Sequence, residues 1–158
     1  MSDHQMQLDE LLQRAFRYAL SLTHDRHQAE ELMQDACLAV ARRGGPWRIS
    51  YMITVIRHRQ IDIYRREAVL KFRSLDDLEA ACTASGSSEI IDEELEAALG
   101  TLRPEERELL FLAAVEEYSM SEIAELTDRP RGTVLSAVHR AKHKLRVILS
   151  NNSSIQIL

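Results

Sequence analysis

The segment 131–148, RGTVLSAVHRAKHKLRVI, constrains the fold of this chain more than any other stretch. Read as a helix, it gathers apolar side chains on one stripe and leaves basic and small polar side chains on the opposite face. A short unit, SMSEIAELTDRP, comes directly before it. Two helices joined by a tight turn, the second apolar beneath and basic above, predict a helix-turn-helix. Duplex DNA is therefore the leading partner.

The charges are sorted along the chain, although the net charge is −5. Residues 42–73 carry nine basic and two acidic side chains, and residues 129–146 carry six basic and none acidic. The stretch between the two blocks, 74–128, is strongly acidic. A single basic run is as readily explained by a solvated helix face. Two such blocks, one inside a helix-turn-helix, favour two contact surfaces for a polyanion.

Composition places the chain among proteins with a packed core and without a membrane span. Of its 158 residues 45% are hydrophobic, and no apolar run approaches the roughly 18 residues that cross a bilayer. The start, MSDHQMQLDE, has neither the basic beginning nor the apolar core of a secretion signal. Cys37 and Cys82 are too few for a disulfide framework and lack metal-ligand spacing. We expect a cytoplasmic protein with no membrane insertion, no cofactor and no metal.

Helical periodicity dominates the first half of the chain. A first amphipathic helix starts near Leu8 and ends near Thr23, and Asp25 can cap a second one, which the segment 44–46 (GGP) stops. A basic third helix is expected from Ser50 to beyond Tyr64. Because residues 52–56 are rich in β-branched side chains, a strand there is the alternative.

The second half begins with a stretch of linker composition, residues 74–88, which loses periodicity and gains small polar side chains. A helix closed by Gly100 follows, and Pro104 suits the first position of the next, expected over 104–118. Ser119 and Glu122 have the spacing of a capping box for the first helix of the DNA-binding pair.

These elements predict an all-α fold with two small helical domains joined by a flexible linker. The first domain is expected over 1–73, the linker over 74–88 and the helix-turn-helix domain over 89–150. A frayed tail over 151–158 completes the chain.

Three stretches of this chain, in order, resemble the extracytoplasmic-function (ECF) group of bacterial RNA polymerase sigma factors. AEELMQDACLAVAR (29–42) resembles the helix that grips core polymerase, and YMITVIRHRQIDIYRR (51–66) resembles the segment that reads and melts the minus-ten element. Residues 95–146 resemble the domain that binds the minus-thirty-five element. The resemblance implies a non-enzymatic initiation factor whose partners are core RNA polymerase, promoter DNA and an anti-sigma factor.

The resemblance also assigns candidate contact residues. Those facing core polymerase are Glu31, Gln34 and Asp35, with an ordinary acidic surface as the alternative. In the minus-ten segment basic groups can hold phosphates and planar groups can meet unstacked bases; the residues are Arg57, His58, Arg59, Tyr64, Arg65 and Arg66. Tyr51 is more simply a packed aromatic residue.

On the recognition helix the first turns enter the major groove most deeply, and later side chains more readily meet phosphate. The residues of the first turns are Arg131, Thr133 and Ser136. The later ones are His139, Arg140 and Lys144. Val134, Val138 and Leu145 are expected in the core.

Several positions depart from the family pattern. His58 stands where members often carry Asn, and the connection 43–50 is several residues shorter than usual. Leu135 and Ala137 occupy positions that are commonly basic. Because each phosphate contact adds to a salt-dependent affinity, losing two basic residues predicts weaker anchoring on DNA.

Three other readings stay open on the sequence. A sigma-like decoy that sequesters an anti-sigma factor would share the fold. The departures at His58, Leu135 and Ala137 favour it, whereas the retained arginines of both basic blocks oppose it. A helix-turn-helix repressor or activator leaves the basic third helix unexplained. A metal site at His139 and His143, four residues apart, lacks a third ligand and the HExxH pattern.

Overall fold

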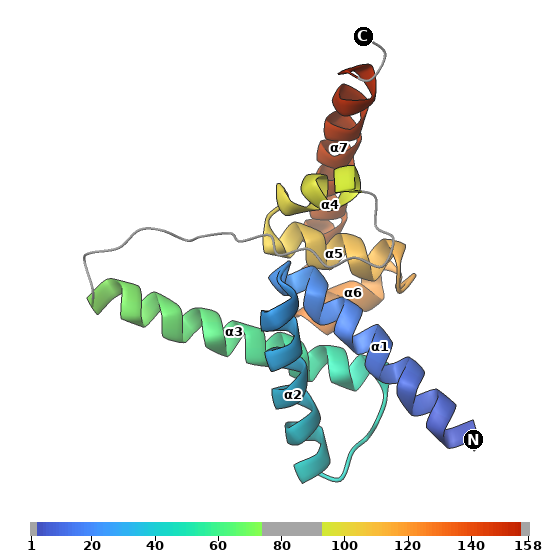
Figure 1. Cartoon of the computed structure of the whole chain (residues 1–158), viewed down its shortest axis with the longest axis vertical. Coiled ribbons are helices and arrows are strands. Elements are labelled where there is room, and N and C mark those ends of the chain that lie inside the picture. The colour runs from blue at the N-terminus through green and yellow to red at the C-terminus, as the bar shows by residue number, and fades with distance from the viewer. Residues whose placement is uncertain (1–2, 74–92, 156–158) are drawn as a thin grey trace. The chain divides into compact units, whose positions relative to one another are not determined.

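Every regular element of the described chain is an α-helix. The computed structural model describes residues 3–73 and 93–155 (Figure 1). The helices are α1 (Asp3–Thr23), α2 (Arg26–Arg42), α3 (Ile49–Arg73), α4 (Glu93–Gly100), α5 (Pro104–Ala114), α6 (Met120–Thr127) and α7 (Arg131–Ile155). The all-α prediction is confirmed. The alternative strand at 52–56 is wrong, because α3 passes through it. The predicted linker 74–88 lies outside the described residues, so its boundaries stay a prediction.

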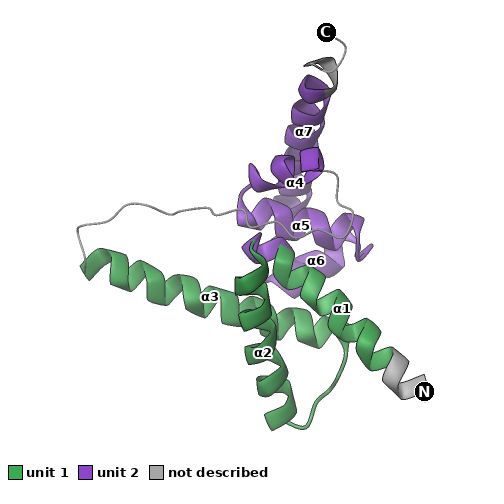
Figure 2. Ribbon diagram, in the orientation of Figure 1, with its two compact units in different colours: residues 1–20, 25–85 green, residues 21–24, 86–158 purple. Residues whose placement is uncertain are grey.

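The chain divides into two compact units (Figure 2). The first consists of residues 1–20 and 25–85, and the second of residues 21–24 and 86–158. The first unit therefore holds α2, α3 and most of α1, and the second holds α4 to α7.

The core of the first unit forms where α2 packs on α3. On both helices the buried positions recur at intervals of three and four, which places them on the facing stripes. The α2 residues are Ala29, Leu32, Met33, Ala36 and Val40, and the α3 residues are Met52, Ile53, Ile56 and Gln60. From α1, Ala15, Tyr18 and Ala19 are fully buried. Beyond Gln60, α3 continues with mostly exposed side chains to Arg73.

Both ends of α2 follow from local chemistry. Asp25 caps its start, because the carboxylate accepts a hydrogen bond of 2.9 Å from the backbone N–H of Gln28, as predicted. At the other end Gly44 and Gly45 have φ angles of 76° and 102°, which glycine adopts without steric cost. The helix therefore ends at Arg42, where the connection to α3 begins.

The second unit is built around α7, which packs against α4, α5 and α6. Its apolar stripe includes Val134, Val138 and Ala141, all 3% exposed or less, as predicted. Leu145 is only half-buried, and it packs with Leu99 on a cluster formed by Leu102, Leu110 and Ala141.

Two helices differ in length from the sequence prediction. We expected α5 to run to Tyr118, but it ends at Ala114, because the chain enters a left-handed conformation at Glu117, with φ 57°. In contrast, α7 continues to Ile155, into the segment that we expected to be a frayed tail. The polar sequence SNNSS contains neither Gly nor Pro, the residues that most strongly end a helix.

We predict that Ile53→Ala destabilises the first unit by about 3 kcal/mol, the usual cost of removing a fully buried Ile side chain. Val69→Ala, on the same helix but at a position that is 53% exposed, is the control and should change the free energy of unfolding little. Urea denaturation, followed by circular dichroism and by the fluorescence of the single tryptophan, Trp47, measures both. Equal effects of the two variants would contradict the packing of α3 described above.

Candidate nucleic-acid interface

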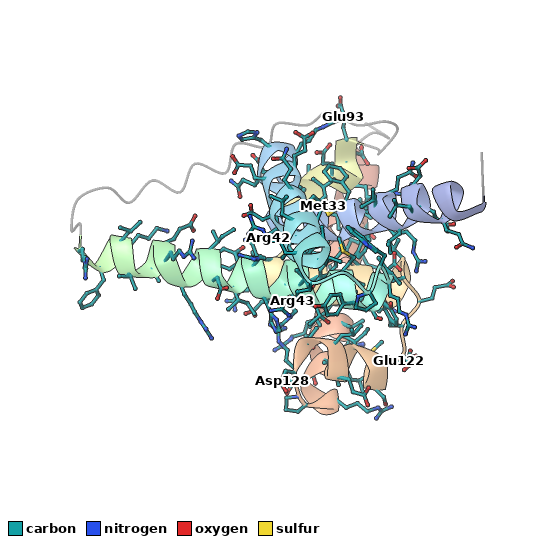
Figure 3. The ribbon with its side chains drawn as sticks, turned by 90° about the horizontal axis from the view of Figure 1, so that it is seen from below. Met33, Arg42, Arg43, Glu93, Glu122 and Asp128 are labelled. Carbon is teal, nitrogen blue, oxygen red and sulfur yellow. The ribbon has the colours of Figure 1, made fainter. Side chains whose placement is uncertain are left out.

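A tight turn joins α6 to α7. Asp128 ends α6 in the left-handed conformation, with φ 52° and ψ 48°, and Arg129 and Pro130 complete the turn before α7 begins at Arg131. Asp is one of the few non-glycine residues that visits this conformation at low cost. Figure 3 shows Asp128 and Glu122 at opposite ends of α6. The predicted helix-turn-helix is thus present, with α7 as its second helix.

The start of α6 is fixed by the capping box predicted from the sequence. The Ser119 hydroxyl accepts a hydrogen bond of 3.2 Å from the N–H of Glu122, and the Glu122 carboxylate accepts one of 2.7 Å from the N–H of Ser119. The hydrogen bond from the Ser119 backbone N–H to the Glu122 carboxylate, and after it a side-chain hydrogen bond from the Ser119 hydroxyl, lower the pKa of Glu122. At the other end of α6 the buried Thr127 hydroxyl donates to the Ile123 carbonyl at 2.7 Å. Both ends of α6 are therefore satisfied locally.

The outer face of α7 carries the residues predicted to contact the minus-thirty-five element. All six are exposed. They are Arg131, Thr133, Ser136, His139, Arg140 and Lys144. Leu135 is also exposed, at 50%, and leaves an apolar position on this basic face.

Ala137 does not lie on the outer face. It is 8% exposed and lines a cleft between α5 and α7, together with Thr133, Arg140 and Lys144 from its own helix. The sequence analysis noted Ala137 as a position that is commonly basic in the family. Its methyl group is buried because Ala137 follows Val134 by three positions, close to the stripe that packs inward.

Two basic residues of this cleft were missed by the sequence analysis. Arg103 precedes α5 and Arg129 lies in the turn before α7, and both line the cleft. Arg103 stands directly before Pro104, the first residue of α5. Arg129 stands directly before Pro130, the residue that precedes α7. A basic residue beside a proline at a helix start was the available signal, but the interpretation considered only positions within helices.

Lys144 is bound by a carboxylate of α5. Its ammonium donates to Oε1 of Glu106 at 2.8 Å, and the backbone N–H of Arg103 donates to Oε2 of the same side chain at 3.1 Å. Burial raises the pKa of Glu106, but these hydrogen bonds and the nearby positive charges outweigh it, and the net effect lowers the pKa. Glu106 is therefore a buried, ionised group that joins α5 to α7.

The second basic surface lies on α3 and begins before the buried core of that helix ends, since Arg57, His58 and Arg59 precede the buried Gln60. His58, Arg65 and Arg66 are exposed and Tyr64 is 42% exposed, whereas Arg57 and Arg59 are half-buried. Lys71 and Arg73 extend the exposed basic side chains to the end of the helix. One continuous helix therefore presents all six residues predicted for the minus-ten element.

The short connection before α3 brings two aromatic residues near the start of that helix. Trp47 is 43% exposed. Tyr51 is half-buried, and its hydroxyl accepts a hydrogen bond of 3.3 Å from the Arg43 guanidinium. Figure 3 shows Arg43 and Arg42 at the end of α2 that leads into this connection. Tyr51 is thus a partly packed residue with a polar partner. Trp47 is an exposed aromatic side chain that the sequence analysis did not consider.

The face of α2 opposite the core carries the residues predicted to meet polymerase. Glu31, Gln34 and Asp35 are exposed, and Glu31 lies 3.3 Å from the imidazole of His27 one turn earlier. Leu38 is 53% exposed and, at three residues from Asp35, continues the same face. Leu38 is thus an exposed apolar side chain on a face that is otherwise acidic and polar.

Neither a membrane-spanning helix nor a metal site is present in the described part of the chain. No helix in residues 3–73 and 93–155 is long and apolar enough to cross a membrane. Within the same ranges no three His, Cys, Asp or Glu side chains are grouped as a metal site requires. His139 and His143 are both exposed on α7.

Comparison with known proteins matches these two units to two conserved regions. Residues 8–69 match the family model of sigma-70 region 2, and residues 92–145 match that of sigma-70 region 4. An all-α protein with these two regions in this order is a sigma factor of the sigma-70 type. Together with the relatives described next, the matches show that the chain belongs to the ECF group of this family.

Two relatives carry that group in their names. The chain is 28% identical over 152 residues to the ECF RNA polymerase sigma factor SigE of Mycolicibacterium smegmatis, covering 89% of this chain and 59% of that protein. It is 26% identical over 143 residues to the ECF RNA polymerase sigma factor EcfG of Rhodopseudomonas palustris, covering 84% of this chain and 77% of that one. The chain thus spans about three fifths of the length of the first relative.

A solved structure has the same fold. The sigma factor RpoE of Bartonella quintana, crystallised in complex with the anti-sigma factor NepR, superposes with a TM-score of 0.73 at 21% identity. The match covers 95% of this chain and 98% of that one.

We predict that Lys144→Gln lowers stability at neutral pH by about 0.5 kcal/mol, because the Lys144 side chain is 47% exposed and its charge is screened by solvent. The folded pKa of Glu106 lies below its ordinary value of 4.5, so the pair stabilises the fold above that pH and is lost as the pH falls through the folded pKa. The difference between the wild type and Lys144→Gln should therefore shrink below about pH 4.5. Lys142→Gln, with the same charge change on the same helix, is the control. Urea denaturation at pH 7 and at a series of lower pH values checks this, and a difference that stays constant as the pH falls would contradict it.

Proposed function

We propose that this chain binds core RNA polymerase and directs promoter-specific initiation of transcription. The observation that carries the proposal is that each of the two sigma-70 regions presents its own exposed basic helix, α3 in the first and α7 in the second. A single DNA-binding helix would serve any repressor. Two, in the order of regions 2 and 4, serve a protein that contacts a promoter at two elements.

In this proposal the first domain, 1–73, recognises and melts the minus-ten element. Arg57, Arg59, Arg65 and Arg66 supply positive charge for the phosphates of the opened strand. Tyr64 and His58 are exposed planar groups on which unstacked bases can stack. Because α3 is unbroken through this segment, all six residues lie on the same helix.

The second domain, 89–150, binds the minus-thirty-five element through α7. Arg131, Thr133 and Ser136 lie in the first turns, which reach the base edges in the major groove. His139 and Arg140 lie further along and are placed for the phosphate backbone. Lys144 belongs to the same face but is paired with Glu106.

Core polymerase binds the exposed face of α2. Glu31, Gln34 and Asp35 offer acceptors and negative charge, and Leu38 offers an apolar anchor between them and the end of the helix. The polymerase performs the chemistry, and this chain supplies recognition without being an enzyme and without a cofactor. Its place of action is then the cytoplasm, where the polymerase and the chromosome are.

An anti-sigma factor is the proposed regulator. The solved structure with the same fold is named as a complex with such a protein. The decoy reading would keep this partner and lose initiation, so the two readings differ in a single measurable activity.

Run-off transcription tests the proposal. Purified core polymerase, saturated with the full chain, is given a library of promoter sequences, and the transcripts are sequenced to find their start sites. Initiation at a shared motif is the expected result. Polymerase binding without initiation would favour the decoy, and failure to bind polymerase would overturn the proposal.

We predict that Arg65→Gln and Arg66→Gln each lower open-complex formation about threefold at 150 mM salt, the loss expected for one phosphate contact. Permanganate footprinting of the opened strand on the best promoter measures it. Arg17→Gln, an exposed arginine of α1, is the control for the charge change and should leave the footprint unchanged. An equal footprint for all three variants would exclude these arginines from the opened strand.

We predict that Asp35→Ala and Leu38→Ala each weaken the affinity for core polymerase about tenfold, because they sit in the middle of the exposed face of α2. Biolayer interferometry with immobilised core polymerase measures the dissociation constants. Glu10→Ala, at an exposed position of α1, is the matched control. If the control and the two variants bind alike, α2 is not the polymerase-binding helix.

A further inference from the structure

The cleft between α5 and α7 combines positive charge with two carboxylates. Four cationic side chains line it, together with Glu105 and Glu106 from the first turn of α5. The cations are Arg103, Arg129, Arg140 and Lys144. A surface built only to hold phosphate would not carry two acids among its cations, because each acid repels the ligand.

Each carboxylate holds one of these cations in an ion pair. Glu106 Oε1 lies 2.8 Å from the Lys144 ammonium, and Glu105 Oε1 lies 3.6 Å from the Arg129 guanidinium. The Glu106 side chain is only 11% exposed and is also held by the N–H of Arg103, so its position is fixed from both oxygens. Glu105 is 70% exposed, whereas its partner Arg129 is 23% exposed.

The paired cations belong to the DNA-facing side of the second unit. Lys144 follows Arg140 by four positions and Thr133 by eleven, so the three share one line along α7. Arg129 precedes α7 in the turn. A phosphate that meets Arg140 or Thr133 therefore comes close to both ion pairs.

We propose that Glu105 and Glu106 are specificity-determining residues that restrain the sequence-independent part of DNA binding. This inference rests on the proposed function of α7. A cation that is already neutralised by a carboxylate releases fewer counterions when it approaches DNA, so its contribution to backbone affinity falls. Arg131 and Ser136 do not line the cleft, so their contacts with base edges do not involve these carboxylates. The two acids thus lower binding to any duplex more than binding to the correct one.

The test compares Glu105→Gln and Glu106→Gln with Glu93→Gln in the full chain. Glu93 is exposed at the start of α4 and does not line the cleft, so its replacement makes the same change in net charge elsewhere (Figure 3). Fluorescence anisotropy with a labelled duplex lacking promoter elements, and in parallel with the best promoter found by run-off transcription, gives the binding constants from 50 to 200 mM salt. We expect each cleft variant to bind about threefold more tightly at 50 mM salt, with a log–log salt slope steeper by about one, and Glu93→Gln to match the wild type.

A double-mutant cycle distinguishes an effect of the Glu106–Lys144 ion pair on the salt slope from an effect of altered folding. In the wild type Lys144→Gln should alter the salt slope little, because the ammonium is already paired. In the Glu106→Gln background the same substitution should remove the added slope of about one. Since Glu106 also accepts a bond from the start of α5, thermal melting of each variant is recorded. Glu105→Gln, whose site is mostly exposed, carries the test if Glu106→Gln unfolds.

The two proposals fail in different ways. If the wild-type chain binds no duplex, alone or with core polymerase, the proposed function is overturned. If the wild type binds and both cleft variants behave as Glu93→Gln does, the function stands and the role of Glu105 and Glu106 is overturned. A gain that is equal on promoter and non-promoter duplexes would also overturn it, because the acids would then not affect specificity.

Discussion

The burial of one side of α7 is the interaction on which the second unit depends. Val134, Val138 and Ala141 pack inward against three shorter helices, none of which is long enough to be stable alone. Because this stripe is fixed, the orientation of the opposite face is fixed too, and Arg131, Ser136 and Arg140 are presented to solvent at helical spacing. The apolar side of the helix therefore determines which side chains can reach DNA.

In the first unit a single helix serves both the core and the candidate DNA surface. The two overlap between Ile56 and Gln60, and beyond Gln60 the helix is mostly exposed. The beginning of α3 buries Met52, Ile53 and Ile56 against α2, and its continuation to Arg73 is almost wholly exposed. The buried part anchors the exposed part. An exposed helix without such an anchor would be marginal in water, so the packing of α2 on α3 is what allows the basic segment to remain ordered for its ligand.

Periodicity and capping predicted most of the fold, because both are local properties. The helix starts at Arg26 and Met120 followed from Asp25 and Ser119, and the core stripe of α7 followed from spacing alone. What could not be predicted depends on neighbours that are distant in sequence. Arg107 is 8% exposed because its guanidinium donates to the Leu102 carbonyl at 2.6 Å, and nothing in the local pattern distinguishes it from a surface arginine.

In the candidate site, too, the local features could be predicted and the contacts between distant residues could not. The exposure of the six α7 positions was predictable, whereas the pairing of Lys144 with Glu106, 38 residues away, was not. Because of this pairing, the formal charge of the basic block 129–146 overstates the positive charge that DNA would encounter, since acidic side chains of α5 neutralise part of it. In a chain with a net charge of −5, the placement of individual carboxylates among the cations, rather than the sum over a segment, determines how strongly each surface attracts a polyanion.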